Sequence, residues 1–275
     1  MDDKILSGKV GVIFGVASHR SIAAGIATAW ASQGAALVLN YQDERVHNNV
    51  CRLAKELRSQ FGTKVLLLPC DVTDDAQISQ FFVSVREQFD HVDLLLHSIA
   101  YAPRQALDEG FTKTSREDFT TALNVSVYSL IALTREALPL MARGGSILAM
   151  TFLGSQKVIP HYNVMGVAKA SLESGVQYLA ADLGPRGIRV NAISAGPMQT
   201  LSARGIADFS IMHKFHQEHS PLQRNCTLEE IGSSALFLSS DAASAITGQV
   251  IYVDSGYSIL GMPGLYSPTE FSGKE

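Results

Sequence analysis

The feature that most constrains the fold is a regular alternation of short apolar runs with longer amphipathic segments along all 275 residues. Short apolar runs that end in turn residues are typical of buried parallel strands, whereas apolar residues at helical spacing are typical of helices. We expect seven strands, at residues 9–15, 35–40, 64–69, 92–97, 145–150, 188–193 and 250–253. Repeated strand–helix units of this kind predict a parallel sheet with helices on both faces.

The segments between these strands predict the helices. We expect helices at residues 21–33, 44–61, 74–89, 114 to about 141, 160–183 and 227–238. Thr114 with Glu117, and Thr227 with Glu230, have the spacing of a capping box, which predicts where two of these helices begin. No linker or repeat divides the chain, so residues 1–275 are expected to form one Rossmann-type α/β domain with a doubly wound parallel sheet of about seven strands.

Composition excludes several classes of protein. Hydrophobic residues are 46% of the chain and charged residues 17%, which is enough apolar material for a core. The net charge of −4 does not favour nucleic acid as a partner. No apolar run is long enough to cross a membrane, and the first residues do not resemble a signal peptide, so we expect a cytoplasmic protein. Cys51, Cys70 and Cys226 lack both zinc spacing and a disulfide framework, so we expect reduced thiols.

One connection is much longer than the others. Residues 199–224 separate the sixth predicted strand from the next helix, at the edge of the sheet where ligands bind, so we expect a helical substrate lid there. Residues 263–275 follow the last strand as a C-terminal tail. His213, His216 and His219 recur every third residue within the lid, but this spacing winds around a helix, and we expect no metal site.

The loop after the first strand is a candidate phosphate site. It contains Gly15, Ser21 and Ile22 and opens the first helix, although it is not a G-x-G-x-x-G motif. Free backbone N–H groups and the helix dipole attract a pyrophosphate at such a position. The alternative is an ordinary strand–helix turn. Further candidates for cofactor binding follow three other strands: Asp71, Val72, Ser98, Ile99, Ala100, Ala195, Gly196, Pro197, Met198 and Thr200. Together these positions predict a dinucleotide site along one edge of the sheet.

The end of the second strand indicates which cofactor is bound. Gln42 stands near the position where an acidic residue usually binds the ribose of NAD, and it cannot neutralise a 2′-phosphate. This favours NADH over NADPH. Arg20 and Arg45 leave NADPH open as an alternative.

Tyr162 and Lys169 are the candidate catalytic residues. They are seven residues apart on the long predicted helix, so their side chains share one face two turns apart. At that spacing the lysine can reach the nicotinamide ribose and the tyrosine can reach a substrate beyond it. A buried tyrosine and a lysine that reaches solvent along an amphipathic helix would produce the same pattern without any catalytic role.

Six motifs resemble those of the bacterial NADH-dependent enoyl-acyl-carrier-protein reductases, a divergent branch of the short-chain dehydrogenase/reductase superfamily. In chain order, the motifs begin at Gly15, Cys70, His97, Pro160, Arg189 and Val253. The Tyr-x6-Lys spacing distinguishes this branch from common short-chain alcohol dehydrogenases, which have Tyr-x3-Lys and a serine about thirteen residues before the tyrosine. This chain has Gly166 and Ala149 at those two positions.

The resemblance implies an activity and roles for residues. The implied reaction is NADH-dependent reduction of the trans-2 double bond of an enoyl thioester, the last reductive step of fatty acid elongation. Tyr162 would donate a hydrogen bond to the thioester oxygen, Lys169 would orient the ribose, and Thr151 would lie beside the nicotinamide. The residues expected around the substrate are Tyr101, Ala102, Tyr162, Met165, Ile206, Phe209 and Met212.

The chain departs from the resemblance at two places. Most members have a second tyrosine where this chain has Phe152, and many have basic lid residues at the positions of Ala207, Ser210 and Ile211. The resemblance also implies a homotetramer and an acyl carrier protein as partner, with an altered docking patch. Two alternatives are a carbonyl or hydroxyacyl dehydrogenase of the same superfamily and a non-catalytic, NAD-binding regulatory protein.

Overall fold

The computed structural model describes residues 4–141, 144–205 and 207–262. Seven strands form one parallel sheet: β1 (Val10–Phe14), β2 (Ala36–Tyr41), β3 (Val65–Pro69), β4 (Leu94–His97), β5 (Gly145–Thr151), β6 (Ile188–Ala195) and β7 (Val250–Val253). Their order across the sheet is β3-β2-β1-β4-β5-β6-β7. All neighbouring strands pair in parallel, which confirms the predicted sheet.

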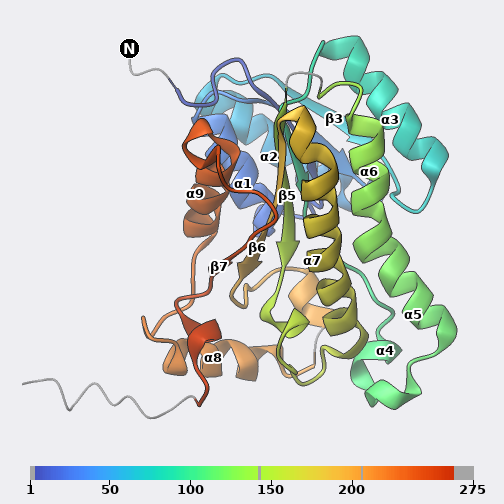
Figure 1. Ribbon diagram of the computed structural model, residues 1–275, viewed down its shortest axis with the longest axis vertical. Helices are drawn as coiled ribbons and strands as arrows, with labels where there is room; N and C mark the ends of the chain where they lie inside the picture. The colour runs from blue at the N-terminus through green and yellow to red at the C-terminus, as the bar shows by residue number, and fades with distance from the viewer. Residues whose placement is uncertain (1–3, 142–143, 206, 263–275) are drawn as a thin grey trace, which may run out of the picture.

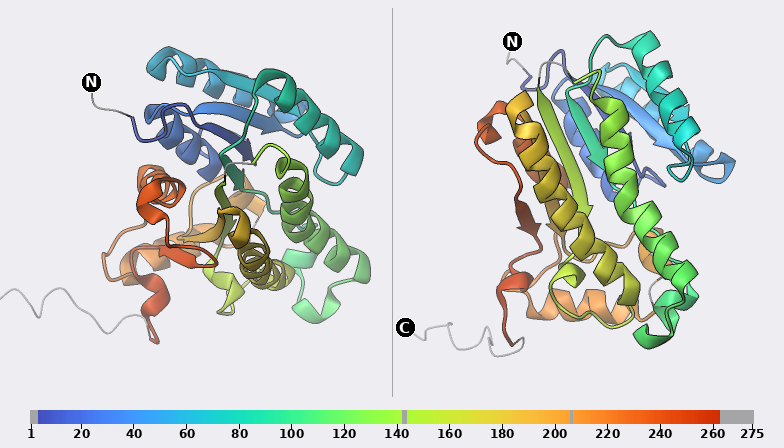
Figure 2. Two further views of the ribbon diagram at one scale, coloured as in Figure 1. Left: turned by 45° about the horizontal axis from the view of Figure 1, so that its top comes forward. Right: turned by 45° about the vertical axis from the view of Figure 1, so that its right-hand side comes forward.

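Helices cover both faces of the sheet (Figures 1 and 2). One layer contains α1 (Ile22–Ser32), α2 (Glu44–Phe61) and α9 (Leu228–Ser239), and the other contains α3 (Asp75–Gln88), α6 (Ser129–Ala137) and α7 (Asn163–Leu183). Each layer buries its own apolar cluster against the sheet. The short helices α4 (Gln105–Asp108) and α5 (Arg116–Leu123), with α8 (Phe209–His219), lie near the end to which the β5 arrow points in Figure 1. The doubly wound architecture is therefore confirmed.

The helix predicted from residue 114 to about 141 corresponds to α5 and α6, and its boundaries differ from the prediction. Its N-cap is Ser115, whose hydroxyl accepts a hydrogen bond from the Asp118 backbone, so the predicted Thr114–Glu117 capping box is wrong. Thr114 instead ends a short 3₁₀ turn. The helix is also interrupted by a π-helical turn, Asn124–Tyr128, and α6 ends at Ala137 rather than near residue 141. By contrast, Thr227 and Glu230 form the predicted capping box of α9.

Helix α7 also begins later than expected. Residues 160–162 form a turn, and the helix begins at Asn163 with Tyr162 as its N-cap. The reason is local backbone conformation: His161 and Asn163 have positive φ angles of 61° and 39°, so α7 cannot extend further towards the N-terminus through residues 160–162. Tyr162 is therefore placed by a turn rather than by the helix.

Strand order reverses beside β1, where β2 and β4 lie on opposite sides of it. Open α/β sheets bind ligands at the carboxyl ends of the strands around such a switch point. Gly15 follows β1 with φ of +100°, and a Cβ there would lie 2.0 Å from the Ser98 carbonyl oxygen at the end of β4. Only glycine allows these two strand ends to approach so closely.

The described residues offer no candidate for a membrane-spanning helix or a metal site. None of the helices formed by the described residues is long and apolar enough to cross a membrane. Within residues 4–141, 144–205 and 207–262, no group of three or more His, Cys, Asp or Glu side chains could hold a metal ion. His213 and His216 are instead hydrogen-bonded to Asn225, and His219 to the backbone of its own helix.

Because Gly15 lies so close to the Ser98 backbone, Gly15→Ala should destabilise the protein more than Gly62→Ala does. Gly15→Ala should lower the free energy of unfolding by about 3 kcal/mol, because it combines an unfavourable φ with a clash against rigid backbone. Gly62→Ala is the matched control, since Gly62 has φ of +68° and a Cβ added there would meet nothing within 4 Å. It should cost about 1 kcal/mol. Equal losses in urea denaturation of the two variants would contradict this account.

Candidate active site

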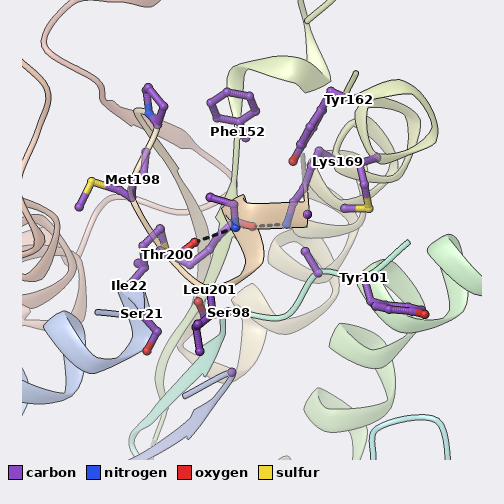
Figure 3. Close-up of a pocket in the computed structure, with 18 of the residues that line it drawn as sticks. Ser21, Ile22, Ser98, Tyr101, Phe152, Tyr162, Lys169, Met198, Thr200 and Leu201 are labelled. Atoms are coloured by element: carbon purple, nitrogen blue, oxygen red, sulfur yellow. Dashed lines mark hydrogen bonds between the residues drawn. The ribbon is translucent and has the colours of Figure 1, made fainter. Parts of the chain in front are cut away.

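A cavity of about 520 Å³ opens at the carboxyl edge of the sheet, between the strand ends and residues 200–205 and 209–212 (Figure 3). It brings together most of the predicted site residues: Gly15, Ser21, Ile22, Ser98, Ile99, Ala100, Tyr101, Ala102, Thr151, Phe152, Tyr162, Met165, Lys169, Ala195, Gly196, Pro197, Met198, Thr200, Phe209 and Met212. These residues come from β-strand ends, the start of α7 and the long connection after β6. The cavity thus joins the expected cofactor and substrate positions in one space.

Tyr162 lies in the wall of this cavity and is only 8% exposed. Its ring packs edge-on against Phe152, with ring centroids 5.0 Å apart and an interplanar angle of 66°. Burial, together with the negative charge of Glu173, raises the pKa of the Tyr162 hydroxyl above its ordinary value. None of the described residues forms a hydrogen bond with this hydroxyl. Tyr162 is therefore a neutral donor with its proton available to a molecule in the cavity.

Two glycines explain how Tyr162 is positioned. A Cβ on Gly154 would lie 2.4 Å from the Tyr162 ring, so only glycine leaves room for the ring at this place. A Cβ on Gly166 would lie 2.8 Å from the Gly154 carbonyl oxygen. Because helix α7 approaches the Gly154 backbone so closely, no lysine side chain fits at position 166. The Tyr-x3-Lys arrangement of common alcohol dehydrogenases is therefore sterically excluded here.

Lys169 reaches the cavity from the next part of α7 (Figure 3). It is 5% exposed, and its Nζ donates a hydrogen bond to the Met150 carbonyl oxygen at 2.7 Å. Burial lowers the pKa of the ammonium to about 8, and the nearby Glu173 carboxylate opposes that decrease. Lys169 therefore carries a positive charge at neutral pH, with further N–H donors beyond the one that Met150 accepts.

The strand ends β1, β4 and β6 fit the predicted dinucleotide. Gly15 follows β1 and lies against the Ser98 backbone at the end of β4, and the Ser21 hydroxyl caps α1, which begins at Ile22. Gln42 and Asp71 do not line the cavity, but they follow β2 and β3 and are hydrogen-bonded to each other at 3.3 Å. Val72 also lies outside the cavity lining. These three residues lie at the strand ends on the far side of β1, as an extended cofactor with an adenosine half requires.

The part of the cavity where we expect the substrate is apolar. Met165, Phe209 and Met212 contribute to its wall, and Tyr101 is 53% exposed at its rim. Ile206, which we expected in this wall, lies outside the described residues. The connection at residues 199–224 contains a 3₁₀ turn, Ser202–Gly205, followed by α8, so it is helical as predicted.

Sequence reasoning missed part of the site. Arg104 and Leu107 line the cavity from the short α4 region, which has too few residues for a recognisable helical pattern. Asn163 donates hydrogen bonds to the Leu107 and Glu109 carbonyls and so fixes that region beside Tyr162. Glu173, buried one turn after Lys169, was also not predicted, although its four-residue spacing from the lysine was visible in the sequence.

Comparison with known proteins agrees with this geometry. Residues 15–258 match the family model described as enoyl-(acyl carrier protein) reductase. The chain is 49% identical over 258 residues to the NADH enoyl-acyl-carrier-protein reductase FabI of Bacillus cereus, covering 94% of this chain and all of the relative. It is 48% identical to the corresponding Bacillus subtilis enzyme, covering 92% of this chain and 97% of the relative.

Solved structures give the same result. The crystal structure of the Bacillus cereus enoyl-acyl carrier protein reductase with NADP+ and indole naphthyridinone superimposes with a TM-score of 0.91, covering 94% of this chain and 100% of that one. The reductase of Anaplasma phagocytophilum in complex with NAD is 43% identical and superimposes with a TM-score of 0.89, covering 95% and 98% of the two chains. This chain therefore belongs to the enoyl-acyl-carrier-protein reductase family.

Proposed function

We propose that the 520 Å³ cavity is the site at which this chain uses NADH to reduce the trans-2 double bond of an enoyl thioester, the last reductive step of fatty acid elongation. The observation that carries this proposal is the Tyr162 hydroxyl. It is buried, neutral and unpaired among the described residues, and it shares the cavity with the charged Lys169. This combination supplies one hydrogen-bond donor for a substrate and one cation for a cofactor.

The proposed roles follow from what each group can donate. Bound NADH supplies a hydride for the β-carbon of the enoyl group, and negative charge then develops on the thioester oxygen. Tyr162 donates a hydrogen bond to that oxygen, which stabilises charge that is present only near the transition state. Lys169 donates to the ribose hydroxyls and adds positive charge. Thr151 would lie beside the nicotinamide, and the α-carbon of the enolate would take up a proton from water, which completes the saturated thioester.

Phe152 occupies the position of the family's second tyrosine and cannot donate a proton. Its edge contact with the Tyr162 ring supports a packing role, in which it holds the single hydroxyl in place. The apolar side chains Met165, Phe209 and Met212 would then contact the acyl chain, and residues 199–224 would form a lid over it.

We also propose an acyl carrier protein as the substrate's carrier, a homotetramer as the assembly and the cytoplasm as the location. The names of the matching family and of its relatives support the carrier, whereas the assembly is what the sequence resemblance implies. Phe119 on α5 and Ile131 on α6 are large, exposed side chains that are available for contact between subunits.

Tyr162→Phe should lower kcat about 100-fold or more and leave the Kd for NADH nearly unchanged, because loss of one oxyanion donor costs about 3 kcal/mol of barrier. Steady-state kinetics with an enoyl thioester and a separate NADH titration measure the two effects. Tyr178→Phe is the matched control, since this tyrosine is on the same helix and is 78% exposed. Full activity of Tyr162→Phe would remove Tyr162 from the mechanism.

The enzyme should prefer NADH to NADPH in kcat/KM. Gln42 offers no charge to a 2′-phosphate, the adjacent Asp71 carboxylate would repel one, and Arg45 is paired with Asp43. The Gln42→Arg variant should narrow the preference by adding a cation at the same place. Equal use of the two cofactors by the wild type would contradict this prediction and indicate that Arg20 or Arg45 binds the phosphate.

The carrier should make only a modest difference to the reaction. Ser210 and Ile211 are exposed without positive charge, Lys214 is paired with Glu218 at 3.6 Å, and Arg224 is paired with Glu230 at 2.6 Å. Long-range attraction of an acidic carrier should therefore be weak. We expect similar kcat/KM for carrier-bound and coenzyme A-bound substrates of one chain length, with shallow salt dependence. A strong carrier preference that disappears at high salt would refute this.

A further inference from the structure

Helix α7 holds the end of β5 at two consecutive residues. Lys169 donates to the Met150 carbonyl oxygen at 2.7 Å, and one turn later the Glu173 carboxylate accepts a hydrogen bond from the Thr151 hydroxyl at 2.6 Å. Glu173 is 8% exposed and Thr151 5% exposed, so this contact is shielded from water. The helix thus places a carboxylate directly behind the two residues that face the cofactor in the proposed function.

Glu173 has no cation within ion-pair distance among the described residues, which is unusual for a buried carboxylate. Its spacing of four residues from Lys169 places both side chains on one face of α7. Two opposite charges on one buried helix face interact more strongly than they would in water. The carboxylate therefore favours the charged form of the lysine, and it opposes the effect of burial on the lysine pKa.

Other titratable groups near Lys169 and Glu173 do not supply the negative charge that keeps the lysine protonated. His97, at the end of β4, is fully buried, and burial together with Lys169 lowers its pKa to about 3, so it is neutral. Tyr162 at the start of α7 and Tyr252 on β7 are both neutral, because burial and Glu173 raise their pKa values. Asp254, after β7, raises the pKa of Tyr252, but among the described residues it is the charge of Glu173 that raises the pKa of Lys169.

We propose that Glu173 is a positioning residue: it keeps Lys169 protonated for cofactor binding, and it fixes the Thr151 hydroxyl so that its oxygen faces the cofactor as an acceptor. This inference rests on the proposed contact of Lys169 with the cofactor. The hydroxyl of Thr151 has one proton, which it donates in the hydrogen bond to Glu173. A ligand group against Thr151 must then be a donor, such as an amide N–H or a ribose hydroxyl.

The test is NADH binding followed by fluorescence across the pH range that spans the lysine pKa of about 8. In the wild type, affinity should fall as pH rises through this value, because the ammonium is lost above it. Glu173→Gln keeps the size of the side chain and an amide oxygen that can still accept the hydrogen bond from Thr151, but it removes the charge. Its midpoint should shift to lower pH by about one unit or more. At pH values well below both midpoints, the variant and the wild type should bind NADH equally.

Three further variants make the outcome decisive. Glu173→Asp retains the charge, so its midpoint should stay near that of the wild type. Lys169→Met should bind NADH weakly with no change over this pH range, and the double variant Lys169→Met/Glu173→Gln should behave in the same way. If Lys169→Met binds NADH as well as the wild type does, the proposed function of Lys169 is wrong. If Lys169→Met fails to bind but Glu173→Gln keeps the wild-type midpoint, or binds equally weakly at every pH, the inference about Glu173 is wrong.

Discussion

The packing of helix α7 against the end of β5 is the constraint on which the site depends. Gly166 allows the helix to approach the Gly154 backbone, and Gly154 in turn leaves room for the Tyr162 ring. The same approach brings Lys169 within hydrogen-bond distance of the Met150 carbonyl. Since position 166 cannot carry a side chain, the lysine that serves the cavity comes one turn later. The wide spacing between tyrosine and lysine is thus a consequence of packing.

Burial then determines what these groups can do. Tyr162 remains protonated because its anion would be poorly solvated, and His97 beneath the site remains neutral for the corresponding reason. Lys169 differs because it remains charged at neutral pH although it is buried, since the nearby Glu173 carboxylate opposes the decrease in its pKa. A neutral donor and a cation that are both largely shielded from water interact more strongly with a developing oxyanion than exposed groups would. This is the electrostatic arrangement that enoyl reduction requires.

Much of the fold followed from local sequence patterns. The strands and long helices were predicted to within a few residues because apolar periodicity and turn residues determine them. The turn at Tyr162 was missed, because two non-glycine residues there adopt positive φ, which tertiary contacts impose. The N-cap at Ser115 was missed because two adjacent residues offer the same hydroxyl chemistry. The cavity wall from Arg104 and Leu107 depends on long-range packing that no local pattern encodes.

The structure of a ternary complex with NAD+ and a non-reducible enoyl thioester analogue would test the central claim most directly. The account predicts that the Tyr162 hydroxyl lies within hydrogen-bond distance of the thioester oxygen, that Lys169 contacts the nicotinamide ribose, and that the acyl chain lies beside Met165 and Phe209. A thioester oxygen bound by another group, with Tyr162 directed away from it, would contradict the account even if the cofactor were bound as expected.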